Sequence, residues 1–317
     1  MWTFLVYALP LGIIAIANLG VRHRAWRWLT HIGLCLLNAL AIFAGLLLLR
    51  ATHPMPPMLE GMNLGTLGLA FIAMGMLGFA CLSISVRRAL AHWLDIDPAS
   101  PVHTTALVFL VYLAALSLGT LLSGWELQRA AAETVGIAPE SLVFGQLFFV
   151  LLALAGVGLG IRRNVRQTLA RLGLSMPSLR HLKSAIAMIA AFLFLDYVTS
   201  WLWHQFWPVH YRMVMEATQR LFAPYNSPAG ALLLALSAGI GEETLFRGAL
   251  QPRFRIALTA AVFALGHMQY TLSPAILEIW LIGLALGWLR QKSNTMTCMI
   301  VHIGYNFLDM FLMRFLP

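Results

Sequence analysis

The sequence predicts an all-α fold, a polytopic transmembrane helical bundle of about ten spans. The first observation is composition: of the 317 residues, 60% are hydrophobic and 10% are charged, whereas roughly a quarter of a soluble domain is charged. The second is length, because many apolar runs approach the roughly 20 residues that a helix needs to cross a bilayer core. A soluble protein of this composition would lack the polar surface to face water.

Ten apolar runs are the expected spans. The first has no basic leading segment and no small-residue cleavage site, so we expect a span there rather than a signal peptide. The runs cover residues 1–19, 28–49, 64–85, 104–124, 143–161, 185–206, 229–250, 256–271, 274–290 and 295–314.

Basic residues divide unevenly between alternate loops. Fifteen of the 21 Lys and Arg residues fall in one set of loops and five in the other, which by the positive-inside rule predicts a cytoplasmic first set and both termini outside. The basic residues behind the net charge of +9 are too scattered to form a face that tracks phosphates, so no nucleic-acid partner is expected. The expected partner is membrane lipid. The fifteen are Arg22, Arg24, Arg27, Arg87, Arg88, Arg162, Arg163, Arg166, Arg171, Arg180, Lys183, Arg253, Arg255, Arg290 and Lys292.

Ionisable side chains inside the spans indicate a functional layer, because each costs several kcal/mol in hydrocarbon unless protein surrounds it. Glu242 and Glu243 are adjacent in the run 229–250, and two neighbouring carboxylates cannot both ionise cheaply in a low dielectric. Arg247 lies one turn beyond Glu243 and can pair with it along the helix face, which favours a structural ion pair. Glu242 then points away from that pair and is free for a different role.

Two histidines lie deep in the last spans, each with a partner four residues away. Phe263 precedes His267 and Asn306 follows His302, and this spacing places both members of a pair on one helix face. Counted from the expected cytoplasmic ends, Glu242, His267 and His302 lie roughly 12 to 18 Å deep. Three helices are therefore predicted to bring a Glu, a His and a His–Asn pair to one level of the bilayer.

Such a layer suits hydrolysis. A partly desolvated carboxylate can act as general base on a water, with a His that positions the water or protonates the leaving amine. A second His and an amide can donate hydrogen bonds to the oxyanion that develops on a scissile carbonyl. No cofactor or metal is expected, because the sequence has neither HExxH nor CxxC, although His267, His302 and a carboxylate could in principle supply three zinc ligands.

Three short motifs resemble those of the CPBP family, the CAAX proteases and bacteriocin-processing enzymes. The stretch from Glu242 to Arg247 matches its EExxxR motif, Phe263 to His267 matches FxxxH, and His302 to Asn306 matches HxxxN. Each motif is weak alone, but the three occur in order on three different spans. The resemblance covers roughly residues 229–315. We therefore expect an N-terminal transmembrane region of unassigned function at 1–184 and a CPBP-like catalytic transmembrane core at 185–317.

The resemblance implies an intramembrane glutamic endopeptidase similar to the type II CAAX prenyl proteases. Carried over position by position, Glu242 would activate the water together with His267. His302 and Asn306 would form the oxyanion site. The supporting residues would be Glu243, Arg247 and Phe263.

Two other functions remain open. One is a non-catalytic immunity or regulatory protein of the same family, in which partner binding replaces cleavage. The other is a proton-coupled transporter, because intramembrane Glu and His also mark proton relays, although no inverted repeat is found. For the protease, the expected substrate is a peptide or protein that reaches the bilayer, either lipidated or carrying a C-terminal membrane segment. The short loops are typical of a bacterial cytoplasmic (inner) membrane protein.

Overall fold

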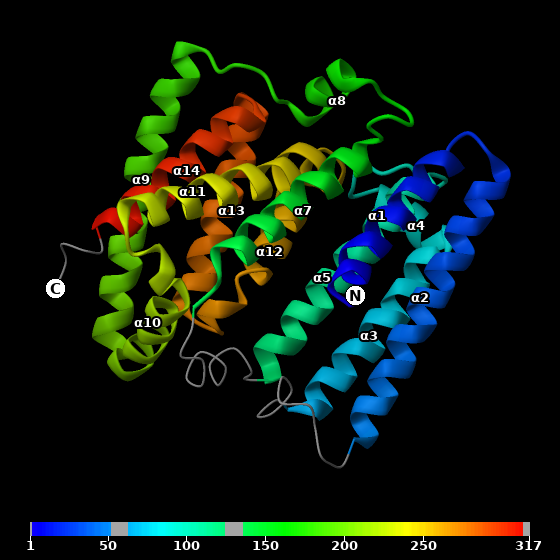
Figure 1. Ribbon diagram of the computed structural model, residues 1–317, viewed down its shortest axis with the longest axis horizontal. Helices are drawn as coiled ribbons and strands as arrows, with labels where there is room; N and C mark the ends of the chain where they lie inside the picture. The colour runs from blue at the N-terminus through cyan, green and yellow to red at the C-terminus, as the bar shows by residue number, and fades with distance from the viewer. Residues whose placement is uncertain (1, 52–62, 124–135, 313–317) are drawn as a thin grey trace.

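The computed structural model describes residues 2–51, 63–123 and 136–312, and these residues form a bundle of helices without strands (Figure 1). Short 3₁₀ turns η2 (Ala223–Tyr225) and η4 (Met268–Tyr270) and a π-helical segment η3 (Thr244–Leu250) join some of them. The α-helices are α1 (Trp2–Gly20), α2 (Arg24–Arg50), α3 (Leu64–Leu82), α4 (Ile84–Ala91), α5 (Pro101–Ser123), α7 (Pro139–Val157), α8 (Val165–Leu172), α9 (Leu179–Phe206), α10 (Pro208–Phe222), α11 (Pro228–Glu243), α12 (Gln251–Leu265), α13 (Pro274–Lys292) and α14 (Thr295–Leu312).

The all-α membrane bundle predicted from the sequence is confirmed, but the count of ten spans is not. Each of the ten apolar runs falls on helical structure. Among the described residues, six helical stretches are long and apolar enough to cross a membrane. The runs 229–250 and 256–271 fall largely within the stretch 228–265, which is interrupted by non-helical backbone at Arg255. The six stretches are 24–50, 64–82, 101–123, 139–157, 179–206 and 228–265.

Two hydrophobic clusters hold the helices together. The larger one joins helices from both ends of the chain, with Leu34, Val108 and Phe246 among its buried members. The smaller one, around Phe192 and Leu286, joins α9, α13 and α14. Outside these clusters many large apolar side chains are exposed, as expected of helices that face lipid rather than water.

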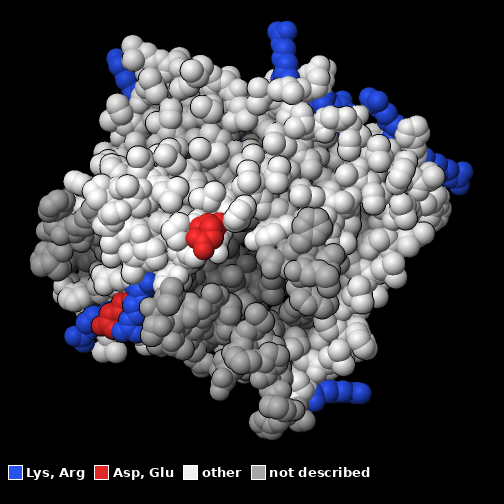
Figure 2. Space-filling model, in the orientation of Figure 1, with Lys and Arg blue, Asp and Glu red and all other residues white. Residues whose placement is uncertain are grey.

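Basic loops gather at one end of the bundle. The α1–α2 connection, α4 and α8 lie at the upper end in Figure 1. In Figure 2 most of the visible Lys and Arg side chains lie along the upper and lower edges, and one acidic side chain interrupts the wide uncharged belt between them. This is the distribution expected when polar edges flank the hydrocarbon layer.

Helix α11 begins at a strong start signal and packs closely on α14. The Ser227 side chain accepts a hydrogen bond from the amide of Gly230, and Pro228 occupies the first turn, where its missing N–H costs nothing. A Cβ built on Gly239 would lie 2.5 Å from the Ile303 side chain of α14. Glycine at this position therefore allows the two helices to approach to the distance that the site requires.

The chain reverses direction near Arg255. Glu242 and His267 are 25 residues apart and would lie roughly 38 Å apart on a straight helix, yet their side chains approach to 4.0 Å. Arg255 has φ 60° and ψ 174°, a strained conformation for a residue with a Cβ. Its guanidinium contacts Asp95 at 3.2 Å, and the amide of Asp95 donates to the carbonyl of Arg253. The loop after α4 thus holds the turn.

Helix α8 stabilises the segment that precedes this turn. The guanidinium of Arg171 donates hydrogen bonds to the carbonyls of Gly248 at 2.9 Å and Ala249 at 3.2 Å, both in the π-helical segment. Burial, and then the nearby charge of Arg253, lower the pKa of the Arg171 guanidinium to about 10. Arg171 therefore remains charged near neutral pH and anchors η3 to the basic end of the bundle.

Candidate active site

Glu242 and Glu243 end helix α11, where the backbone widens into the π-helical segment η3. Single π-helical turns inside α-helices occur frequently at functional sites. The two side chains point to different surroundings, as expected for adjacent helical positions. Glu243 is fully buried, and the Glu242 side chain is 12% exposed.

Glu243 is the centre of a buried polar cluster. Its Oε1 accepts a hydrogen bond from Arg247 at 2.9 Å and another from the Nδ1 of His302 at 2.8 Å. Arg247 is 1% exposed, and its guanidinium carbon lies 4.3 Å from the ring centroid of Phe263. The ion pair expected from the four-residue spacing is therefore present, and a cation–π contact adds to it.

The contact with Glu243 sets the proton position on His302. A carboxylate oxygen only accepts hydrogen bonds, so the Nδ1 of His302 carries the proton. In the neutral ring the Nε2 then has a free lone pair. This Nε2 faces Glu242 Oε2 at 4.0 Å.

His267 reaches the same oxygen from outside a helix. We expected the helix to continue to residue 271, but α12 ends at Leu265 and the backbone of His267 leaves the helical conformation. Its Nδ1 lies 2.9 Å from the carbonyl oxygen of Phe263, which only accepts, so this nitrogen carries the proton. The imidazole thereby bonds a carbonyl at the helix end, and its Nε2 faces Glu242 Oε2 at 4.0 Å.

Glu242 Oε2 thus lies between two imidazole nitrogens but bonds to neither. It is buried and has no hydrogen-bond partner among the described residues. A separation of 4.0 Å is too long for a direct hydrogen bond and suits groups bridged by one water. Two tetrahedral zinc ligands at about 2.1 Å from the ion would lie roughly 3.4 Å apart, which is closer than these atoms. No cluster of three or more His, Cys, Asp or Glu side chains suited to a metal occurs in the described part of the chain.

The other carboxylate oxygen of Glu242 is bonded to a residue that the sequence argument missed. Gln146 of α7 donates a hydrogen bond from Nε2 to Glu242 Oε1 at 3.0 Å. A signal was present, because Gln146 is an amide within the apolar run 143–161. Asn306 is also an amide, but it lies four residues from His302, whereas Gln146 has no ionisable residue at helical spacing to single it out.

Asn306 lies one turn beyond His302 on α14 and is half-buried. The HxxxN spacing therefore holds in the helix. None of the hydrogen bonds found among the described residues joins its amide to the other predicted site residues. The oxyanion role remains a prediction from the motif.

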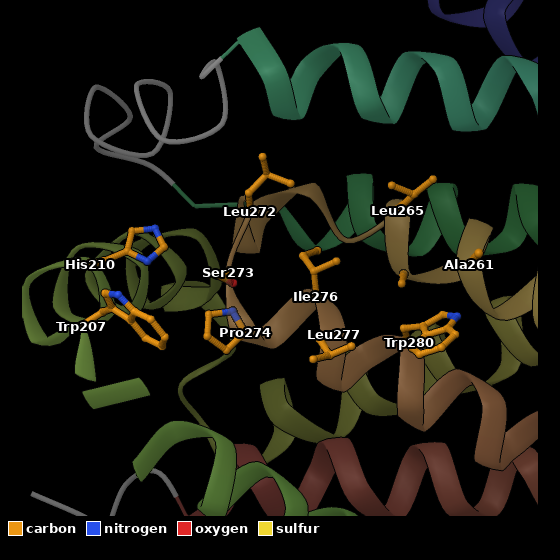
Figure 3. Close-up of a pocket in the computed structure, with 11 residues that line it drawn as sticks. Trp207, His210, Ala261, Leu265, Leu272, Ser273, Pro274, Ile276, Leu277 and Trp280 are labelled. Carbon is orange, nitrogen blue, oxygen red and sulfur yellow. The ribbon is translucent and has the colours of Figure 1, made fainter. Parts of the chain in front are cut away.

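An apolar groove opens beside the site. Figure 3 shows it between Trp207 and His210 of the α10 region and residues of α12 and α13, including Ala261 and Trp280. Its volume is about 680 Å³, and its lining is mainly apolar. Leu265 also lines it and is two residues from His267, although Glu242 and the two site histidines do not.

Comparison with known proteins gives one match. Residues 224–308, roughly a quarter of the chain, match the family described as Type II CAAX prenyl endopeptidase Rce1-like. No curated protein and no solved structure matches. The match confirms the resemblance to CAAX proteases that the three motifs predicted, and it spans all three. Gln146 lies outside it.

Proposed function

We propose that this chain is an intramembrane endopeptidase in which Glu242 activates water. The apolar helices and the family match indicate an integral membrane protein that resembles a protease family. One observation supports the finer mechanism above all others. The buried and unpaired Oε2 of Glu242 faces the Nε2 atoms of His267 and His302 at 4.0 Å each.

In this mechanism a water donates one hydrogen bond to Glu242 Oε2 and the other to His267 Nε2. The water oxygen attacks the scissile carbonyl carbon while its proton passes to Glu242. His302, which takes a proton from solvent at Nε2 before the reaction and keeps it throughout, and the amide of Asn306 donate hydrogen bonds to the resulting oxyanion. The C–N bond then breaks, and the proton held by Glu242 passes to the leaving amine. One water is consumed, and one carboxylic acid and one amine are formed, which then exchange a proton to give a carboxylate and an ammonium group.

Glu243 stabilises the positive charge that His302 carries in this mechanism. Its carboxylate accepts from the Nδ1 of His302, so it stabilises the imidazolium that forms when Nε2 takes a proton. Arg247 offsets the charge of Glu243 and leaves the buried cluster near neutral before His302 takes its proton. Removal of either residue of the Glu243–Arg247 pair would leave the other buried without this counter-charge.

For the substrate we propose a peptide or protein that enters from the bilayer with a hydrocarbon part, either a lipid or a membrane segment. The apolar groove beside His267 supports this proposal. The matched family is described as a prenyl endopeptidase, which favours a lipidated substrate. The lining is mainly apolar, so the groove would receive hydrocarbon rather than a charged chain.

We also propose a bacterial cytoplasmic membrane as the location, with the basic end of the bundle in the cytoplasm and both termini outside. The fifteen-to-five division of basic residues supports this orientation. A C-terminal fusion to alkaline phosphatase should be active, and the same fusion to green fluorescent protein should be dark. The reverse pattern would invert the topology.

The test of the function compares protein termini in membranes from cells that carry the wild-type chain or its Glu242→Gln variant at equal abundance. Termini present with the wild type and absent with the variant are expected, and their flanking residues would reveal the substrate class. Glu216→Gln is the control, because Glu216 is an exposed acid in α10. Identical termini with wild type and Glu242→Gln would overturn the proteolytic function and favour an immunity or regulatory role.

A further inference from the structure

Gln146 hydrogen-bonds the side chain of Glu242 from outside the region that carries the three motifs. It lies on α7, in the region 1–184 for which the motifs predict no function, and 96 residues before Glu242. Its side chain nevertheless reaches the carboxylate of Glu242 at 3.0 Å. The site therefore draws on two parts of the chain that the family match separates.

The contact is built into the packing of α7 against α11. A Cβ placed on Gly241 would lie 2.3 Å from the Oε1 of Gln146 and 2.8 Å from its backbone oxygen. The two helices thus meet at backbone level beside Glu242. Any larger residue at position 241 would force them apart, because a backbone oxygen cannot turn aside.

The orientation of the Gln146 amide follows from chemistry. A carboxylate oxygen accepts only, so the donor Nε2 must face Glu242 and the carbonyl Oε1 must face Gly241. That Oε1 is buried and has no hydrogen-bond partner among the described residues. A buried amide with an unpaired oxygen destabilises the protein by about 1–3 kcal/mol. Packing alone therefore does not explain why a glutamine occupies position 146.

Gln146 also makes the two oxygens of Glu242 different. Oε1 is bonded to the amide, and Oε2 is left facing the two imidazoles. The terminal torsion of a glutamate is soft, so without a donor the carboxylate would rotate among several positions. One hydrogen bond on Oε1 restricts that rotation and keeps Oε2 where a water can meet it.

We infer that Gln146 is a positioning residue for Glu242, so that helix α7 of the N-terminal region forms part of the catalytic machinery. The inference rests on the proposed function, because it concerns how the general base is aimed. It differs from a docking role for the N-terminal region. A docking role would alter which substrates are captured, whereas positioning alters how fast a captured substrate is cleaved.

The experiment uses the full chain in membranes. The readout is the initial rate at which the wild-type-dependent termini appear after induction, divided by the amount of monodisperse protein extracted in detergent. Gln146→Met keeps the length of the side chain and removes the donor. We expect the rate per folded molecule to fall about 10- to 100-fold, which is typical when a residue that orients a catalytic group is lost. We expect the thermal midpoint to stay the same or rise, because an unpaired amide oxygen is removed from the interior.

The matched control is Gln251→Met. Gln251 is also a buried glutamine whose Nε2 bonds across helices, to the carbonyl of Gly287 at 2.8 Å, but it has no contact with the carboxylates. We expect its thermal midpoint to fall and its rate per folded molecule to stay within twofold of wild type. A merely structural Gln146 would behave in the same way as Gln251, with stability lost and rate kept.

The outcomes separate the two proposals. If Glu242→Gln abolishes the termini and Gln146→Met cleaves within twofold of wild type, the positioning role is overturned and the protease stands. If Glu242→Gln cleaves like wild type, the proposed function fails and the inference fails with it. If Gln146→Met does not accumulate, Gln146→Leu takes its place, because it also removes the donor without adding a charge and carries the same expected loss and the same twofold limit.

Discussion

Glu243 and His302 are joined by a hydrogen bond of 2.8 Å from the imidazole Nδ1 to the carboxylate Oε1, which links α11 to α14 inside the bundle. The same oxygen accepts from Arg247 at 2.9 Å. One buried carboxylate therefore links α11 to α14, fixes the proton on His302 and compensates a buried guanidinium. A substitution of Glu243 should therefore reduce both stability and activity.

Glu243→Gln is expected to destabilise the protein by about 3–5 kcal/mol, because it leaves the Arg247 charge buried without a counter-charge. Thermal unfolding in detergent would measure this as a lower midpoint. The control is Glu216→Gln, which breaks a pair with the same four-residue spacing, Glu216–Arg220, whose side chains are 65% and 57% exposed. Loss of that surface pair should change stability by less than about 1 kcal/mol. Equal effects of the two substitutions would contradict the view of Glu243 as a buried anchor.

His267→Gln is expected to slow cleavage about 100- to 10,000-fold, the range for loss of a group that handles protons or water. Stability should fall little, because the imidazole is 23% exposed and makes one hydrogen bond, to Phe263. The rate of appearance of wild-type-dependent termini gives the measurement. His92→Gln, at an exposed position after α4, is the control and should leave the rate unchanged. Full activity of His267→Gln would exclude a role for this ring in the reaction.

Gly241→Ala tests the α7–α11 contact from the opposite helix. The added methyl would meet the backbone oxygen of Gln146 at 2.8 Å, so α7 must move away. We expect a loss of about 1–3 kcal/mol of stability and a slower reaction, because Gln146 loses its hold on Glu242. Gly145→Ala on α7 is the control, since a Cβ there meets nothing within 4 Å. That variant should be neutral within about 1 kcal/mol and fully active. Wild-type rates in Gly241→Ala would show that the close approach is not needed.

Ala261→Trp fills the apolar groove beside His267. If the groove receives the hydrocarbon part of the substrate, the large ring should block it and reduce cleavage at least tenfold, with the carboxylates and histidines untouched. Leu36→Trp, at an exposed position on α2 far along the chain, controls for an added aromatic ring in the bilayer. Cleavage at the wild-type rate in Ala261→Trp would place the substrate elsewhere.

Much of this protein could be predicted from residues close together in the sequence. Long apolar runs predict helices, and the structure has helices at every run. The four-residue spacing of Glu243 and Arg247 predicts their ion pair, because an α-helix brings such positions to one face. The shared depth of Glu242, His267 and His302 predicts one layer, and the side chains do meet.

Other features depended on contacts between helices that are distant along the chain. The sequence predicts a break between the runs 229–250 and 256–271, but it does not predict that Asp95, 160 residues away, contacts Arg255 at this break. Nor does it predict that His267 lies beyond the end of its helix, with its ring against the carbonyl of Phe263.

The sequence by itself determined that this is a helical membrane protein and which residue types meet near the middle of its last helices, since hydrophobicity and helical periodicity act over a few residues. Only the tertiary structure decided which oxygen of Glu242 is bonded and which has no hydrogen-bond partner among the described residues. The bonded oxygen is the one that Gln146 reaches, and its position depends on the distance and rotation at which α7 packs against α11. Packing of this kind arises from the whole set of side chains at the interface, and no single stretch of the chain encodes it.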